Sequence, residues 1–266
     1  MFAVGFDLDM TLVDSRPGIA ATYRRLAALT RTSIDADLAV SRLGPPLEQE
    51  IAEWYPAEAV PDAVALYRSL YPHHAITPSP ALPGAAEALA AVREAGGRVI
   101  VVTAKKAELA ALHLDHLGLV TDEVRGLAWA EGKAAALREC RAVVYVGDHV
   151  ADMAAARAAG VRAIGVATGP CPADELLAAG AEVVLRDLRG FPANLPRYYR
   201  LCPQMPLAGV PPAPFNPGPG GEGHSVSVWV PASGQSCAAA IRALEGPDSP
   251  ARPGVLADQE ERNERH

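Results

Sequence analysis

Acidic side chains gather where the first apolar run of the sequence ends. In GFDLDMTLVDS, residues 5–15, Asp7 and Asp9 follow a hydrophobic stretch directly, and Thr11 comes two positions later. Side chains two positions apart in an extended strand lie on the same face, only a few ångströms from each other. Two carboxylates that close repel each other unless a metal ion, a lysine or a shared proton offsets their charge. Any of these three arrangements would make the segment a reactive site.

Two later apolar runs also end in polar residues. RVIVVT, residues 98–103, ends at Thr103, and AVVYVG, residues 142–147, is followed by Asp148 and Asp152. These two acids stand four positions apart where a helix should begin, and hard carboxylate oxygens of this kind suit Mg²⁺. Between them, His149 is expected at the rim of such a site at most.

Lysine is rare in this chain and is therefore informative. Among 24 basic residues only Lys105, Lys106 and Lys133 are lysines. We expect a chain that uses arginine almost everywhere to keep lysine where a compact ammonium is needed. Lys133 opens a helix that feeds the 142–147 strand, which places it near the acids, and Lys105 is the reserve candidate for the same task.

The elements that must position these residues alternate between strands and helices. Apolar runs rich in Val and Ile predict buried strands, and helical spacing of apolar residues between them predicts helices, often ended by Gly. This alternation predicts an α/β fold with a doubly wound parallel sheet, in which the polar strand ends converge at one edge. The expected strands are residues 2–8, 98–103, 142–147, 161–167 and 181–185, and the expected helices are residues 83–96, 105–118, 151–160 and 173–180.

Residues 16–80 interrupt the alternation. Their apolar positions recur at helical spacing in three groups, and Ser15 is a plausible N-cap for the first helix. We expect a small all-helical domain inserted after the first strand. The three groups are Ile19, Tyr23 and Leu26; Leu47, Ile51 and Trp54; and Val60, Val64, Tyr67 and Tyr71.

Residues 199–266 form a tail with a different composition. Its first part is dominated by Pro and Gly, which cannot form a packed core. Although SVSVWV, residues 225–230, alternates like a strand, one strand and one short helix bury too little surface to fold alone. We expect disorder in the tail, with a small element that docks on the body or on a partner as the alternative.

Composition excludes several classes of partner. The formal charge of -7 and the pI near 5.5 disfavour nucleic acid, and no block of clustered Lys and Arg is present. The sequence has no secretory leader pattern and no apolar stretch near the roughly 20 residues that a spanning helix needs, so a cytoplasmic location without membrane contact is expected. The four cysteines have no paired spacing and are expected to be reduced thiols.

Two histidines have a spacing that could suit a metal. His113 and His116 are expected to pack rather than to bind metal.

The ordered set of motifs resembles the haloacid dehalogenase superfamily. The set comprises DLDMT at residues 7–11, Thr103, Lys133 and GDHVAD at residues 147–152, and the resemblance spans residues 1 to about 195. DSRPGI, LGPPLEQE and AARAAGVRAIGVATG look like the phosphoglycolate phosphatase-like branch. The resemblance implies a Rossmann-like core in residues 1–15 and 81–198 and a mobile helical cap in residues 16–80.

The resemblance also implies a role for each matched residue. Asp7 would be the nucleophile that forms an aspartyl-phosphate, and Asp9 would protonate the leaving alcohol and later activate water. Thr103 would bind a phosphoryl oxygen, and Lys133 would hold charge on Asp7. Mg²⁺ would be bound by Asp7, the Asp9 carbonyl and Asp148, with Asp152 in support. The expected substrate-binding residues are Thr11, Arg42, Gly44 and Ala104, with Arg42 and Gly44 at the LGPPLEQE loop.

The sequence therefore predicts a Mg²⁺-dependent phosphatase that acts on a small phosphate monoester through an aspartyl-phosphate. Its partner would be a small phosphorylated metabolite, and the chain would be a monomer or a homodimer. A phosphomutase of the β-phosphoglucomutase type differs only in returning the phosphoryl group to a sugar. A non-catalytic binding protein that uses the tail is the third possibility. The pattern does not identify the ester, because function within a fold depends on the site.

Overall fold

A seven-stranded sheet forms the centre of the computed structural model, which describes residues 1–199 and 227–228. The strand order is β6-β5-β4-β1-β2-β3-β7, and the first six strands in the chain run parallel while β7 is antiparallel to β3. The expected doubly wound α/β fold is confirmed. The strands are β1 (Ala3–Phe6), β2 (Arg98–Val102), β3 (Glu123–Arg125), β4 (Ala142–Gly147), β5 (Arg162–Val166), β6 (Val183–Leu185) and β7 (Ser227–Val228).

The order of the strands reverses at β1. The chain adds β2 and β3 on one side of β1 and then returns to place β4, β5 and β6 on the other side. In open parallel sheets, ligands bind outside the carboxyl ends of the strands at such a reversal. Asp7 and Asp148 follow the two strands that flank this point, and Thr103 follows the neighbouring β2.

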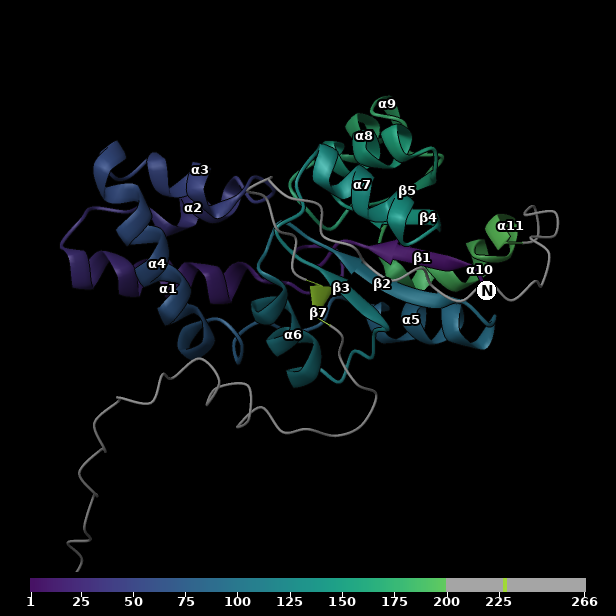
Figure 1. Ribbon diagram of the computed structural model, residues 1–266, viewed down its shortest axis with the longest axis horizontal. Helices are drawn as coiled ribbons and strands as arrows, with labels where there is room; N and C mark the ends of the chain where they lie inside the picture. Colours follow the sequence, from purple (N-terminus) through teal and green to yellow (C-terminus); the bar gives the residue numbers. More distant parts are fainter. Residues whose placement is uncertain (200–226, 229–266) are drawn as a thin grey trace, which may run out of the picture. The chain divides into compact units, whose positions relative to one another are not determined.

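Helices cover both faces of the sheet (Figure 1). One face is covered by α5 (Ala85–Glu94) and α6 (Ala107–His116), with the short η2 (Leu188–Gly190), α10 (Phe191–Asn194) and α11 (Pro196–Tyr199). The other face is covered by α7 (Glu131–Glu139), α8 (Val150–Ala159) and α9 (Ala173–Ala178). Consecutive β1 and β2 side chains point to opposite faces, so the same strands supply both cores.

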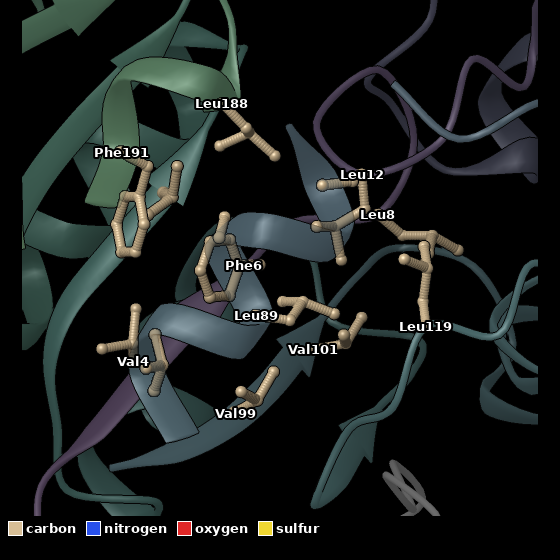
Figure 2. Close-up of a cluster of buried hydrophobic side chains, with 14 of the residues drawn as sticks. Val4, Phe6, Leu8, Leu12, Leu89, Val99, Val101, Leu119, Leu188 and Phe191 are labelled. Carbon is tan, nitrogen blue, oxygen red and sulfur yellow. The ribbon is translucent and has the colours of Figure 1, made fainter. Parts of the chain in front are cut away.

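Valine and phenylalanine side chains fill the core on the α5 side (Figure 2). Phe6 is fully buried there, and its ring meets Phe191 edge to face with 5.3 Å between the centroids. Val4 and Val101 lie on the same face of the sheet, beneath Leu89 of α5. The apolar residues that made these strands recognisable are the ones that bury the sheet.

Between β1 and α5 the chain is helical, as the spacing of its apolar residues predicts. The helices are α1 (Arg16–Thr30), α2 (Ala36–Ser41), α3 (Leu47–Ala52), η1 (Ala57–Ala59) and α4 (Val60–His74), and they share a hydrophobic cluster. The segments entering and leaving this insert run together: Asp14 N donates to Pro80 O and Leu82 N to Leu12 O, each at 2.9 Å. Ser15 lies at the N-cap of α1, as predicted, although its side chain makes no capping hydrogen bond.

The tail falls mostly outside the described residues. Ser227–Val228 pair with Val124 and Arg125 of β3, so these two residues depart from the expected disorder. Cys140 and Cys171 are free buried thiols, as expected, and Cys202 and Cys237 lie outside the described residues. No helix in residues 1–199 combines the length and the apolar character needed to cross a bilayer.

We expect Phe6→Ala to lower the free energy of unfolding by about 3 to 5 kcal/mol, because it empties a fully buried site and removes the contact with Phe191. Denaturant titration followed by circular dichroism measures the change. Leu177→Ala is the control, since Leu177 is 51% exposed and its truncation should change the free energy by less than about 0.5 kcal/mol. Equal effects of the two substitutions would contradict this account of the core.

Candidate active site

A cavity of about 110 Å³ opens at the carboxyl ends of β1, β2 and β4. Its lining combines side chains from these strand ends with side chains from α1, α2, α3 and α4 and from the loop between α2 and α3. Most residues expected to form the site line it together: Asp7, Asp9, Arg42, Gly44, Thr103, Ala104, Lys133 and Asp148. Thr11 and Asp152 do not line the cavity and lie behind it.

Lys133 joins two of the buried acids. Its ammonium is fully buried and lies 3.1 Å from Asp7 Oδ1 and 2.6 Å from Asp152 Oδ1. Asp152 also accepts the His149 backbone N–H at 3.1 Å, which completes the capping of α8. Asp152 therefore holds Lys133 in place and starts the helix that follows β4. Its carboxylate is committed to these contacts, whereas Asp7 remains open to the cavity.

Thr11 supports Asp148. The Thr11 hydroxyl donates to Asp148 Oδ1 at 2.7 Å, and Thr11 is completely buried. This geometry corrects the expectation that Thr11 contacts substrate: the turn after β1 directs its hydroxyl to the neighbouring strand end. That turn is tight, because the Leu8 carbonyl accepts from the backbone N–H groups of Thr11, Leu12 and Val13. Met10 adopts a positive φ of 61° within it.

The buried acids fit a divalent cation. Oxygens of Asp7, Asp148 and Asp152 lie within 4.8 Å of one another, and apart from its ion pair with Lys133, Asp7 Oδ1 has no hydrogen-bond partner in the described part of the chain. Burial, followed by the neighbouring carboxylates, raises the pKa of Asp148 well above its usual range. Burial also raises the pKa of Asp7 to about 7, although Lys133 opposes this rise. The Lys133 ammonium alone cannot offset the charge of three carboxylates. Mg²⁺ binds oxygen ligands and would supply the missing positive charge.

Asp9 has a different cationic partner. Lys105 Nζ lies 2.6 Å from Asp9 Oδ1 and 2.5 Å from the Tyr71 hydroxyl of α4. Burial pushes the pKa of Asp9 upward, but the Lys105 ammonium outweighs it, so the pKa lies below its usual value. Asp9 is therefore a carboxylate in this arrangement. Asp7 and Asp9 look alike in the sequence but have different cationic partners. Lys133 pairs with Asp7, and Lys105 pairs with Asp9.

The chain of contacts continues from Tyr71 to His113 of α6. The Tyr71 hydroxyl lies 2.9 Å from His113 Nε2. Burial, reinforced by Lys105, lowers the pKa of His113 to about 3, so the imidazole is neutral. Because an ammonium can only donate, the Tyr71 oxygen accepts from Lys105 and its hydroxyl donates to His113. His113 is thus buried and hydrogen-bonded, in agreement with the packing role expected for it.

Thr103 and the loop between α2 and α3 complete the lining. Thr103 Oγ1 accepts the Lys105 backbone N–H at 3.2 Å, which leaves its hydroxyl proton available. Gly44 adopts a φ of 140°, and a Cβ on it would meet the His149 ring at 2.9 Å, so this loop lies directly on the residue beside Asp148. The Arg42 guanidinium is held by Glu50, with its Nη2 2.6 Å from Oε1. Sequence reasoning placed Arg42 and Gly44 in the site but gave no sign of Glu50.

Sequence reasoning missed the role of Tyr71 and did not assign Trp129 to the site. Both line the cavity. Tyr71 was recognised from its spacing as a residue on the buried face of a helix, which is correct, and its hydroxyl contact with Lys105 depends on how α4 lies against the core. Trp129 precedes Ala130, whose φ of 47° and ψ of -110° mark a strained loop before α7. The sequence signal for Trp129 was its position four residues before Lys133, a predicted site residue, in a segment with no other aromatic side chain.

The chain matches a known family and several known proteins. Residues 4–166 match the family described as haloacid dehalogenase-like hydrolase. The phosphoglycolate phosphatase of Cupriavidus necator is 33% identical over 213 residues, which cover 73% of this chain and 92% of that protein. A haloacid dehalogenase-like family protein from Streptococcus pneumoniae, SP0104, has the same fold with a TM-score of 0.63 and 24% identity, covering 75% of this chain and 98% of that one.

A third similarity is to a protein named for a different activity. The tyrosine-protein kinase PtkA of Mycobacterium tuberculosis is 31% identical over 184 residues, which cover 64% of this chain. The chain spans only 63% of the length of that kinase.

We expect Asp7 to make metal-free protein less stable as the pH rises from about 4 to about 7. Its pKa is near 3.8 when exposed and about 7 in the folded protein, so in this window the folded state holds a proton that the unfolded state lacks. Stability falls with pH wherever the folded state binds more protons. Denaturant titration with a chelator at pH 5 and pH 8 measures this.

Asp7→Asn supplies the reference for that experiment. The free energy of unfolding of the wild type minus that of the variant should be lower at pH 8 than at pH 5, and Mg²⁺ should restore it at pH 8. Subtracting the variant removes the contributions of Asp9 and His113, which titrate in the opposite sense. A difference that does not change with pH would contradict the raised pKa of Asp7.

We expect Tyr71→Phe to lower the free energy of unfolding by about 1 to 3 kcal/mol, because it leaves the buried His113 Nε2 and one Lys105 donor without a partner. Thermal or denaturant unfolding measures the change. Tyr55→Phe is the matched control, since it removes one partly buried bond to Thr30. If Tyr55→Phe were as destabilising as Tyr71→Phe, the contacts of the Tyr71 hydroxyl with Lys105 and His113 would contribute no more to stability than one partly buried hydrogen bond.

Proposed function

We propose that this chain, which belongs to the haloacid dehalogenase-like hydrolase family, is a Mg²⁺-dependent phosphatase that hydrolyses a small phosphate monoester through an aspartyl-phosphate on Asp7. The observation that carries the proposal is the environment of Asp7. Its carboxylate lines the cavity, forms an ion pair with Lys133 through Oδ1, and lies beside Asp148. A nucleophilic carboxylate needs this combination of exposure to substrate and nearby positive charge.

In the first step, an Asp7 oxygen attacks phosphorus and the bond from phosphorus to the ester oxygen breaks. Lys133 stabilises the negative charge that Asp7 and the phosphoryl group share, and the Thr103 hydroxyl donates to a phosphoryl oxygen. Bound Mg²⁺ supplies positive charge that offsets the carboxylates and the phosphoryl oxygens. Asp7, the Asp9 backbone carbonyl and Asp148 would hold the ion, and Asp152 would act through Lys133 and the start of α8.

Asp9 would carry the proton. The leaving alkoxide takes a proton from Asp9, and in the second step Asp9 removes a proton from the water that attacks phosphorus, which frees Asp7 and releases inorganic phosphate. The Lys105 ion pair keeps Asp9 deprotonated in the free protein. Arrival of the negatively charged ester beside Asp9 opposes that charge and raises its pKa, so that substrate binding itself favours protonated Asp9.

The helical insert, residues 16–80, would act as the cap over a core formed by residues 1–15 and 81–198. Closure of a cap excludes water while the aspartyl-phosphate forms and adds contacts to the leaving group. Arg42, Gly44 and Ala104 line the cavity and would shape that part of the site. One relative is named phosphoglycolate phosphatase, so 2-phosphoglycolate is a candidate substrate.

We expect Asp7→Asn to lower kcat for phosphate release from an aryl phosphate by about a thousandfold or more, because an amide cannot form the acyl phosphate. Chelation of Mg²⁺ should abolish turnover in the wild type, and added Mg²⁺ should restore it. Asp62→Asn, an exposed acid on α4, is the control and should retain activity. Turnover by Asp7→Asn at the wild-type rate would contradict the proposed nucleophile.

The similarity to PtkA favours one further candidate, transfer of the phosphoryl group from Asp7 to a tyrosine hydroxyl instead of water. A phosphate-labelled aryl ester, incubated with the protein and a tyrosine-containing peptide, separates the two outcomes. Label in inorganic phosphate supports the phosphatase, whereas label on the peptide supports the kinase. A sugar phosphate included as an acceptor tests the phosphomutase in the same way.

A further inference from the structure

The cavity has two chemically different ends. Its floor carries the acids and lysines near the strand ends, whereas its roof combines apolar and aromatic side chains with arginines that are already paired with glutamates. Three tyrosines form a continuous wall there: the ring centroids of Tyr23 and Tyr67 are 4.8 Å apart, and those of Tyr67 and Tyr71 are 5.8 Å apart. Each of these tyrosines is at least 95% buried. Other apolar residues of the insert also line the cavity, among them Ile19, Ala39, Leu43 and Leu47.

Two arginines from the helical insert line the roof, and each already has a glutamate partner on α3. Arg42 donates to both carboxylate oxygens of Glu50, at 2.6 and 3.1 Å, and Arg68 donates to Glu48 at 2.7 Å. Glu50 also accepts from the Trp54 indole at 3.0 Å. A bidentate pair of this kind uses the donors that would otherwise recognise a second carboxylate.

We propose, on the basis of the phosphatase function above, that the leaving group of the substrate is an uncharged alcohol with an apolar or aromatic body. A leaving group that carries a carboxylate, as that of 2-phosphoglycolate does, would have to compete with Glu50 for Arg42, so the inference argues against that candidate substrate. The Glu50 side chain is 15% exposed, so the displaced glutamate would be a nearly buried charge without its partner. An apolar leaving group would instead pack against the three tyrosines. Its binding free energy becomes more favourable in proportion to the apolar area that is removed from water.

Lys106 is the cation that could oppose this preference. It lines the cavity at the N-cap of α6, is half-buried, and its ammonium forms no ion pair within residues 1–199. A carboxylate recognised by Lys106 would make the site select acids. The experiment therefore tests this residue directly.

Two esters of matched size decide between the possibilities. Butyl phosphate and 4-phosphooxybutanoate have the same chain length and similarly poor leaving alcohols, and they differ in the terminal carboxylate. We expect kcat/KM to favour butyl phosphate by about tenfold or more, the size of one lost contact in a binding site. Equal values, or a preference for the carboxylated ester, would overturn the inference.

Three variants identify the cause of the preference. Glu50→Gln releases the Arg42 guanidinium and should reduce the ratio of the two kcat/KM values. Glu53→Gln makes the same change in charge at a residue that is 4.0 Å from Arg42 and does not line the cavity, and it should leave the ratio unchanged. Lys106→Gln should also leave it unchanged, whereas a selective loss of activity on the carboxylated ester would reveal a carboxylate site and overturn the inference.

Failure of the phosphatase proposal would be separable from failure of this inference. If neither ester releases phosphate in the presence of Mg²⁺, the phosphatase proposal fails. Pentylphosphonate and 5-phosphonopentanoate, which cannot be hydrolysed, then test the cavity by calorimetric binding to the wild-type protein. Tighter binding of pentylphosphonate supports an apolar subsite, and equal or weaker binding, including no binding of either compound, contradicts it.

Discussion

The arrangement of this site follows from one electrostatic constraint: several carboxylates are buried at the ends of neighbouring strands and require positive charge beside them. The parallel sheet brings Asp7 and Asp148 together because β1 and β4 are adjacent. Lys133 compensates for part of that charge, while burial and the neighbouring carboxylates raise the pKa values of Asp7 and Asp148. A site with this deficit binds a divalent cation favourably, and a phosphate ester can then approach acids that would otherwise repel it.

The second lysine gives the neighbouring aspartate a different environment. Lys105 holds Asp9 as a carboxylate and is itself held by Tyr71, which belongs to α4 of the helical insert. The group proposed to handle protons is therefore linked, through one ammonium, to the segment proposed to close over the substrate. Through this link an α4 hydroxyl contributes to the carboxylate end of the site.

Much of the fold could be predicted because its strands are apolar and short and its helices have clear spacing. The β3 strand escaped prediction because it has three residues, of which Glu123 and Arg125 are charged; parallel pairing with β2 and ion pairs along its edge stabilise it instead. The short α2 was missed for a similar reason, since Asp35 caps it but only Ala36 and Ala39 are buried. Both elements depend on neighbours that local sequence does not reveal.

For the site, the sequence by itself determined which residue types are present and that strand ends would bring them together, because parallel strands share one carboxyl edge. It placed Lys133 beside Asp7 with Lys105 in reserve, but it could not show that Lys105 pairs with Asp9, because that contact depends on the positions of α4 and α6. The tertiary structure decided that pairing, directed the Thr11 hydroxyl to Asp148, and joined Arg42 to Glu50. These contacts link residues that are up to 137 positions apart or lie on different helices, so they depend on packing rather than on any local pattern.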